Sequence, residues 1–388
     1  MLPMHQTPDT LDELAASSTG GAAYGTEAQP AAALTVLNVA YPLAPVGPDA
    51  VGGAEQVLSM LDRELVRAGH RSIVIGCRGS SASGTLVEIP AENGVLDEAA
   101  KSRAQQAHRK AIAAARARWP IDVVHLHGID FHAYLPDDGP TLVSLHLPLD
   151  WYPAEALRPT RDDLWLHAVS PTQQQTAPTA PPGARLVAPI PNGVDIEALS
   201  LVQPKRDFAL VLSRVCPEKG IHLALDAAKQ AGVPLVIGGK VYPYETHTRY
   251  FRDEVQSRLD ARRRFLGPLG FNAKRRFLNA ARCLVIPSLA AETSSLVAME
   301  ALACGTPVVA FPNGALADVI EHGRTGFLVN TVDEMAQAIL AAPSLDAEAC
   351  RVEARRRFSL ERMISSYMAA YQALAQLGTD CRRFAAAP

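Results

Sequence analysis

The sequence lacks long apolar runs, paired cysteines and any strong excess of one charge. No apolar stretch reaches the roughly 20 residues that a membrane-spanning helix requires. Apolar residues nevertheless make up 48% of the 388 residues, a share typical of globular proteins. The sequence therefore predicts a folded protein without a membrane span.

Cysteine is scarce and scattered along the chain. No two of the six cysteines are spaced as Cys-x-x-Cys: Cys77, Cys216, Cys283, Cys304, Cys350 and Cys381. Disulfide frameworks are typical of much shorter secreted domains, so we expect reduced thiols. The first residues are acidic and polar, whereas a secretory signal needs a basic start and an apolar stretch. Both features favour a cytoplasmic protein, either free or peripheral at the inner face of the membrane.

The charge balance and the length exclude further classes. The formal net charge is -3, from 37 basic and 40 acidic residues. Proteins that bind nucleic acid usually carry a marked basic excess, so we expect no nucleic-acid partner. Domains of about 100–200 residues are usual, and the length therefore predicts two of them.

Strand-like apolar runs and helical patterns alternate in the first half of the chain. A helical pattern over residues 57–66 ends at Gly69 and lies between the first two predicted strands. Strands are expected at residues 34–40, 72–76, 123–127, 141–146, 166–170 and 188–191. This alternation is the signature of a parallel sheet covered by helices.

The second half repeats the pattern after a polar linker at residues 204–207. Strands are expected at residues 208–213, 234–238, 283–287, 307–311 and 326–329. From about residue 345 the pattern is helical and rich in arginine. The fold class is therefore α/β, with two doubly wound, Rossmann-like domains facing a central cleft at the carboxyl ends of their strands.

These patterns divide the chain into four parts. We predict a disordered tail over residues 1–33 and a first domain over residues 34–200. The second domain is predicted over residues 207–345. Residues 346–378 are predicted to form C-terminal helices, the last of which crosses back to the first domain.

Residues 286–307 carry the most informative pattern. A strand ends near Pro287, and the hydroxyl residues Thr293, Ser294 and Ser295 are candidates to cap a following helix. That helix is expected over residues 296–304, with Gly305 as its stop. A helix that begins at a strand end binds anions, because its free N–H groups and its dipole both favour phosphate.

Two glutamates and two cations accompany this helix start. Glu300 lies in the second helical turn and can reach back to a ribose, whereas Glu292 precedes the helix. Arg214 and Lys219 follow another strand end, and their charges match diphosphate oxygens. Each of these residues alone is more often a solvated surface charge, but their combination predicts a nucleotide-diphosphate site.

At these positions the chain resembles the retaining family-4 glycosyltransferases of GT-B fold, the glycosyl transferases group 1. The resemblance lies in Glu292 and Glu300 separated by seven residues, in the Arg214-to-Lys219 loop, in a Gly-Gly loop at Gly52, and in a strand ending at His146. The stretch at 191–195 is also similar. The match extends over residues 34–342. One departure is that Thr293, Ser294 and Ser295 stand where many relatives have Phe-Gly.

The resemblance implies a role for each residue in donor binding. Arg214, Lys219 and the N–H groups of Leu296 and Val297 would bind the diphosphate, with Ser295 beside them. Glu300 would hold the ribose, Glu292 the donor sugar, and Leu269 would border the base. The glycines Gly52 and Gly53 would admit the donor phosphate, and His146 would lie near the reacting centre. Arg214, Lys219, Glu292 and His146 are the candidate catalytic residues.

The resemblance also implies the reaction. Family members move a sugar from a nucleotide-diphosphate sugar with retention and without a metal, so we expect transfer of a hexose, with a UDP-sugar favoured, and no cofactor. The acceptor hydroxyl could belong to a small molecule, a glycan or a lipid. The second domain would bind the nucleotide sugar and the first the acceptor. Two alternatives stay open: a nucleotide-sugar-binding protein without turnover, and a lipid-directed enzyme at the membrane surface.

Two further patterns have competing interpretations. His125 and His127 share one face of a predicted strand, but no carboxylate stands at ligand spacing, and we expect no metal there. Residues 101–118 contain six basic residues and no acid, which would suit an anionic membrane. Few large apolar residues accompany them, so a solvated helix face is the favoured interpretation. The arginines at 262–264 and 355–357 are likewise expected on exposed faces.

Overall fold

The computed structural model describes residues 33–92, 94, 96–158, 161–176 and 186–385, with side chains described as far as residue 378. The predicted tail at 1–33 lies, apart from Ala33, outside the described residues. The described part of the chain forms two parallel six-stranded sheets, which we call the first and the second lobe.

The first lobe is a sheet in the order β3-β2-β1-β4-β5-β6, with every neighbouring pair parallel. Its strands are β1 (Thr35–Val39), β2 (Arg71–Cys77), β3 (Thr85–Ile89), β4 (Val123–Leu126), β5 (Thr141–Leu145) and β6 (Leu164–Ala168). The chain direction across the sheet reverses between β1 and β4, and such a switch point is where doubly wound sheets bind ligands.

The second lobe repeats this topology in the order β12-β11-β10-β7-β8-β9, again wholly parallel. Its strands are β7 (Ala209–Leu212), β8 (Leu235–Gly238), β9 (Arg263–Phe265), β10 (Cys283–Ile286), β11 (Val308–Ala310) and β12 (Gly326–Leu328). Here the switch point lies between β7 and β10.

The α-helices connect and cover these strands. They are α1 (Gly53–Arg67), α2 (Glu98–Arg118), α3 (Pro171–Gln175), α4 (Ile196–Leu199), α5 (Ile221–Gln230), α6 (Glu245–Tyr250), α7 (Phe271–Ala280), α8 (Leu296–Ala303), α9 (Leu316–Val319), α10 (Val332–Ala341), α11 (Ala347–Arg357) and α12 (Leu360–Ala385). Short 3-10 segments are η1 (Phe131–Ala133), η2 (Leu149–Trp151), η3 (Pro217–Lys219), η5 (Gln256–Arg258) and η6 (Ala342–Ser344), and η4 (Phe251–Val255) is a π-helical turn.

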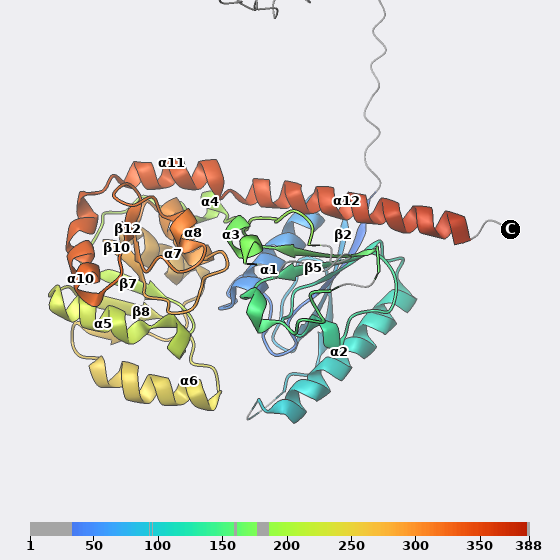
Figure 1. The fold of residues 1–388 in the computed structure, drawn as a ribbon, viewed down its shortest axis with the longest axis horizontal. Helices are drawn as coiled ribbons and strands as arrows, with labels where there is room; N and C mark the ends of the chain where they lie inside the picture. The colour runs from blue at the N-terminus through green and yellow to red at the C-terminus, as the bar shows by residue number, and fades with distance from the viewer. Residues whose placement is uncertain (1–32, 93, 95, 159–160, 177–185, 386–388) are drawn as a thin grey trace, which may run out of the picture. The chain divides into compact units, whose positions relative to one another are not determined.

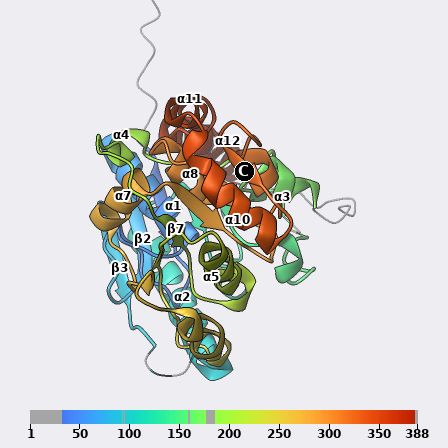
Figure 2. The ribbon, with the colours of Figure 1, turned by 90° about the vertical axis from the view of Figure 1, so that its left-hand side faces the viewer.

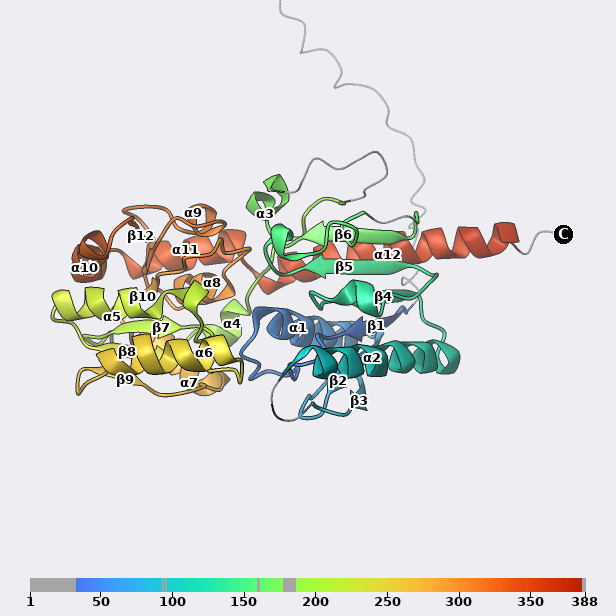
Figure 3. The same cartoon turned by 60° about the horizontal axis from the view of Figure 1, so that its bottom comes forward.

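Each sheet buries a continuous apolar core against its helices. In the first lobe, Ile112 and Ala115 of α2 pack with the buried residues of the strands, and Figure 3 shows α2 lying alongside the sheet. In the second, Leu225 of α5 and Met335 of α10 belong to one core with the strand residues, and the two helices lie side by side in Figure 2. Strands buried in this way read as near-continuous apolar runs, which is why most were visible in the sequence.

The last helix joins the two lobes. After α11, the chain continues as α12 beside the first sheet (Figure 1). Tyr371 of α12 is fully buried, and its hydroxyl lies 2.7 Å from His125 Nδ1 of β4. The Tyr367 hydroxyl lies 3.0 Å from Ser144 Oγ of β5. These hydrogen bonds between buried polar side chains hold α12 in one position on the first lobe.

The structure differs from the sequence analysis in three places. Residues 188–191 form no strand; Ile190 N–H donates to Ala168 O alongside β6, but Pro189 and Pro191 have no N–H to continue a ladder. The edge strands β3 and β9 were missed because they are only partly buried and lack an apolar run. Arg263 therefore lies within a strand, with its side chain 12% exposed and paired to Asp260, rather than on an exposed face.

The basic segment at 101–118 forms most of α2, and several of its charges are neutralised. Lys101 pairs with Glu98 at 2.6 Å, Arg103 with Glu92 at 2.6 Å, and Arg116 with Asp138. None of the helices in the described part of the chain is long and apolar enough to cross a bilayer.

Candidate active site

A pocket of about 380 Å³ opens where the carboxyl ends of both sheets meet. The first lobe lines it with the loop and helix start after β1 and with residues that follow β4 and β5. The second lobe lines it with the loops after β7 and β8 and with the segment from the end of β10 into α8. Every candidate site residue from the sequence lies on this lining: Gly52, Gly53, His146, Arg214, Lys219, Leu269, Glu292, Ser295, Leu296, Val297 and Glu300.

The loop after β7 holds the two expected cations. Arg214 follows the strand end, and Lys219 closes the 3-10 turn η3. Gly220 then turns the chain with a φ of 59°, and a Cβ there would lie 2.2 Å from the Pro287 carbonyl oxygen. Only glycine permits this close turn, which keeps the cation loop against the end of β10.

Lys219 is bound to Glu292 in the structure. Its Nζ lies 2.5 Å from Glu292 Oε1, which also accepts a hydrogen bond from Ser288 Oγ. Burial alone would raise the pKa of Glu292, but Lys219, Ser288 and the charge of Arg214 together lower it. Glu292 is therefore ionised at neutral pH, and among the described residues Arg214 is the pocket cation that pairs with no carboxylate.

The helix start at α8 differs from the expected capped form. Ser295 is the N-cap, but its φ of 58° is left-handed and its side chain makes no capping bond. The Oγ atoms of Ser294 and Ser295 are buried without a described partner, and Thr293 Oγ1 donates to the His146 carbonyl oxygen at 2.9 Å. The predicted N-cap position is thus confirmed for Ser295, but the expected capping bond from a side-chain hydroxyl is absent.

The N–H groups at the start of α8 nevertheless lie on the pocket. Leu296 and Val297 are the first two residues of the helix, whose first N–H groups have no intrahelical acceptor. Gly305 ends the helix with a φ of 66°, as the sequence predicted. The arrangement offers an anion the donors of a helix N-terminus.

Glu300 is buried in the second turn of α8 and is also paired. Lys274 Nζ of α7 donates to Glu300 Oε1 and, at 3.3 Å, to Gln56 Oε1 of the first lobe. Lys274 lines the pocket and was missed in the sequence, where it stands among basic residues typical of a solvated helix face. Each glutamate of the pair is thus matched by one lysine.

The loop after β1 brings glycine and a buried carboxylate to the pocket. Gly52 is the N-cap of α1, and a Cβ there would lie 1.8 Å from Glu55 Oε2. Glu55 is 7% exposed and lines the pocket. Burial raises the pKa of Glu55, although its own backbone N–H and Arg214 oppose the rise. Glu55 could not be singled out in the sequence, because its burial arises only when α1 packs on the sheet.

His146 lines the pocket and belongs to a cluster of imidazoles with His125, His127 and His167. His146 Nε2 lies 3.0 Å from His127 Nδ1, and His127 Nε2 is buried without a described partner. Burial, followed by the charge of His167, lowers the pKa of His146 to about 3. His125 makes its hydrogen bonds to Tyr371 and Ser144. The histidines are therefore neutral hydrogen-bonding groups at neutral pH.

Two family models match the chain in succession. The family described as Glycosyltransferase Family 4 matches residues 51–198, and the one described as Glycosyl transferases group 1 matches residues 206–343. The chain belongs to the group 1 glycosyltransferases of family 4. These two matches cover one lobe each, so the family-4 chain carries both halves of the fold.

Curated relatives share part of this family-4 chain. A segment of 214 residues is 30% identical to the phosphatidyl-myo-inositol mannosyltransferase of Mycobacterium leprae, covering 49% of this chain and 54% of that protein. A segment of 118 residues is 37% identical to the D-inositol 3-phosphate glycosyltransferase of Corynebacterium efficiens, covering 30% of this chain and 28% of that protein. The matches thus span about half or less of these relatives.

Solved structures share the fold over nearly their whole length. The sucrose-phosphate synthase of Thermosynechococcus elongatus has a TM-score of 0.72 at 20% identity, with 88% of this chain and 99% of that chain covered. Anabaena HepE in complex with UDP-glucose has a TM-score of 0.69 at 19% identity, covering 88% and 100%. With the two parallel sheets, these likenesses establish the GT-B fold of the family-4 chain.

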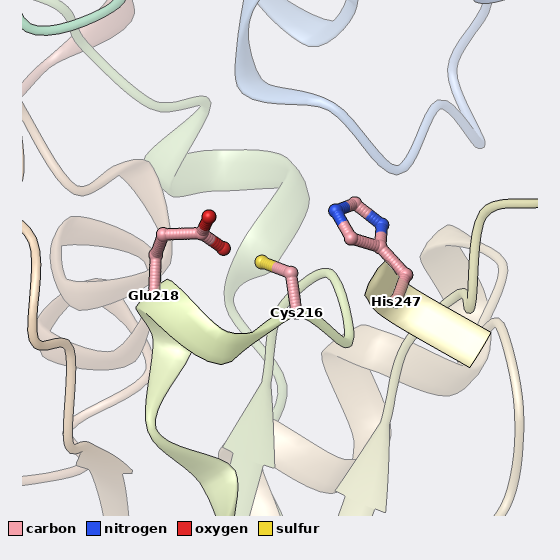
Figure 4. A group of neighbouring side chains, drawn as sticks. All are labelled: Cys216, Glu218 and His247. Atoms are coloured by element: carbon pink, nitrogen blue, oxygen red, sulfur yellow. The ribbon is translucent and has the colours of Figure 1, made fainter. Parts of the chain in front are cut away.

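One group in the described part of the family-4 chain could hold a metal ion. Cys216, Glu218 and His247 place one ligand atom each within 4.8 Å of the other two (Figure 4). Cys216 and Glu218 lie on the loop that carries Arg214 and Lys219.

Proposed function

We propose that this chain transfers a hexose from a nucleotide-diphosphate sugar to an acceptor hydroxyl, with retention and with no metal in the chemical step. The observation that carries the proposal is that Arg214, Lys219 and the start of α8 converge on one pocket at both switch points. Positive charge gathered there would stabilise the departing diphosphate, which is the main demand of this bond cleavage.

The paired lysines support a donor site that is set before the donor arrives. Lys219 and Lys274 are held by Glu292 and Glu300, so these four charges compensate one another before the donor arrives. When a nucleotide sugar enters, the ribose hydroxyls would donate hydrogen bonds to the Glu300 carboxylate. The donor-sugar hydroxyls would donate hydrogen bonds to Glu292. The lysines would then turn part of their hydrogen bonding to the diphosphate oxygens.

Retention is proposed to proceed by substitution on one face of the sugar, with the leaving diphosphate accepting the acceptor proton. Glu292 is occupied by Lys219 and Ser288 and is ionised, so it supports sugar binding rather than proton donation. His146 is a weak base because its pKa is lowered to about 3, so it would orient groups by hydrogen bonds instead of removing the proton.

UDP is the favoured donor nucleotide. The HepE structure of the same fold was solved with UDP-glucose. Leu269 and Pro268 line the pocket on the second lobe beside Gly238 and would border the base. Gly238 has no side chain there, and a Cβ would lie 2.6 Å from Leu269 Cδ1, so this corner is tightly packed.

The first-lobe side of the pocket favours an acceptor without a phosphate group. Its charged lining residues are the carboxylates Asp49 and Glu55, and none of the described first-lobe residues on the lining is lysine or arginine. Tyr41, Trp151 and Tyr152 add ring surface, which suits a sugar or another polyhydroxyl ring. The two curated relatives have phosphorylated inositols in their names, so we propose that this chain differs from them in its acceptor.

The proposal is tested by offering the protein matched UDP-, GDP- and ADP-sugars. A ligand that binds only the folded state raises the melting temperature, and we expect the largest rise with a UDP-hexose. Release of UDP and the anomeric configuration of the product, read by NMR, then test transfer and retention. Strong donor binding without transfer or hydrolysis would favour a nucleotide-sugar-binding protein, and an inverted product would overturn retention.

Cosedimentation with anionic vesicles tests the lipid-directed alternative. Three of the six basic residues of α2, Lys101, Arg103 and Arg116, are already paired with acids, which halves the charge left for a bilayer. We therefore expect the protein to stay in the supernatant at physiological ionic strength. Arg109, Lys110 and Arg118 are exposed and form no ion pair with a described residue. If the protein sediments and replacing these three residues by glutamine abolishes sedimentation, a membrane-surface enzyme is favoured instead.

A further inference from the structure

Three side chains with metal-binding chemistry converge beside the cation loop. Cys216 comes from the loop after β7 and Glu218 from η3, whereas His247 comes from α6, which follows β8. Because β7 and β8 are neighbouring parallel strands, the segments after their carboxyl ends meet at one edge of the sheet. Figure 4 shows the three side chains directed toward one another, with the Cys216 sulfur between the other two.

The spacing of the ligand atoms is close to that of a bound ion. The three lie within 4.8 Å of one another. A tetrahedral zinc ion holds such atoms about 3.3–3.7 Å apart, given zinc bonds of about 2.0–2.3 Å. Glu218 and His247 are only partly buried, so their side chains can rotate to close a difference of about 1 Å.

The surroundings leave these ligand groups available. His247 makes no side-chain hydrogen bond among the described residues, and its Nδ1 is buried. The Glu218 side chain is partly exposed and forms no ion pair with a described residue.

We propose that Cys216, Glu218 and His247 bind a zinc ion, with a water molecule as the fourth ligand. Thiolate, imidazole and carboxylate are the ligand types that zinc prefers, and three protein ligands plus water is a common zinc arrangement. The Cys216 thiol gives up its proton to solvent as the sulfur–zinc bond forms. Because Cys216 and Glu218 flank Pro217 between Arg214 and Lys219, the ion holds the loop that carries both cations.

Metal titration of the untagged full-length protein tests the zinc site. Equilibrium dialysis should give one zinc ion per chain, and cobalt should produce the near-ultraviolet absorption of a thiolate–cobalt bond. We expect Cys216→Ser to abolish that absorption, and Cys216→Ser and His247→Gln each to weaken zinc binding roughly 10-fold or more. Glu218→Gln, at a partly exposed side chain, should weaken binding without lowering the melting temperature.

Matched control variants separate this site from the other thiols and imidazoles. Cys350 is buried, and burial raises its pKa to about 11, as it does for Cys216. His222 is half-buried on α5, the helix before α6. Cys350→Ser and His222→Gln should bind zinc as the unaltered protein does. Equal zinc affinity in the unaltered protein and in all three ligand variants would overturn the proposal, as would cobalt binding without thiolate absorption. UDP binding is measured separately, so failure here leaves the donor site untouched.

Discussion

The two sides of the pocket have the same topological origin but opposite chemistry. On the second lobe, Arg214, Lys219 and Lys274 face Glu292 and Glu300, and both glutamates are paired with a lysine. On the first lobe, the described lining has no lysine or arginine; it has Glu55, two neutral histidines and aromatic rings. Both sets stand at the carboxyl ends of parallel strands next to a switch point.

This difference shows that the topology fixes where a site lies, while the loops decide what it binds. A β-α repeat delivers side chains to the same edge of each sheet. At that edge the second lobe carries lysine–glutamate ion pairs, whose lysines can also bind a diphosphate. The first uses its edge for uncharged groups and two carboxylates, Asp49 and Glu55, which accept hydrogen bonds from hydroxyls. The following predictions test this contrast, beginning with the largest effect.

The neutral histidines of the first lobe should make the protein acid-sensitive. Burial lowers the pKa of His167 to about 4 and of His146 to about 3, whereas an unfolded histidine titrates near 6.5. Between these values the unfolded state binds more protons, so stability is complete above about pH 6.5 and falls as the pH is lowered. Each histidine contributes about 1.4 kcal/mol per pH unit in that window.

Chemical unfolding at a series of pH values measures this loss. We expect the free energy of unfolding to drop by several kcal/mol between about pH 6.5 and pH 4.5. His167→Asn should flatten the slope, whereas His132→Gln, at an exposed position, should leave it unchanged. A free energy that stays level across this window would contradict the neutral cluster.

Removing a cation from the second lobe should affect transfer far more than stability. Lys219→Ala takes away a charge that stabilises the leaving diphosphate, and we expect roughly a 100-fold lower rate of transfer. The melting temperature should change by only a few degrees, because Ser288 and the charge of Arg214 still stabilise the Glu292 carboxylate. Lys229→Ala, on the surface of α5, is the control, and equal rates for Lys219→Ala and Lys229→Ala would refute the phosphate role.

The Glu300 carboxylate should discriminate between nucleotides by their ribose. Glu300→Gln replaces a charged acceptor of two hydroxyl hydrogen bonds, so we expect about 10-fold weaker binding of UDP. Binding of 2′,3′-dideoxy-UDP, which lacks both hydroxyls, should be nearly the same for the two proteins by calorimetry. An equal loss for both nucleotides would indicate that Glu300 only positions Lys274 and does not contact the ribose.

Glu55 on the first lobe should lower the stability of the folded protein and raise the rate of transfer. Burial raises its pKa, so the ionised form is disfavoured and stability declines as the pH rises through its folded pKa. Glu55→Gln should therefore raise the melting temperature by about 2 °C at pH 7.5 while lowering the rate of transfer several-fold. A lower melting temperature with unchanged transfer would indicate a purely structural carboxylate. Asp49→Asn, on the exposed rim, serves as the comparison.

The sequence alone determined the parallel α/β architecture and most of the second-lobe site. Buried parallel strands must be apolar along their length, so β1, β7 and β10 were visible as runs. Arg214, Lys219, Glu292 and Glu300 were also visible, because each follows a predicted strand at a short, fixed distance. Their roles in donor binding stay predictions that the experiments above address.

Only the tertiary structure decided which charges meet. Lys274 pairs with Glu300, 26 residues away in the sequence, and Cys216 lies beside His247, 31 residues away. No helix or strand period relates positions so far apart. The burial of Glu55 and the stacking of His127 on His146 likewise arise when separate strands and helices pack. Local sequence fixes backbone preference and hydrophobic period, but burial and charge pairing depend on neighbours that folding alone brings within a few ångströms.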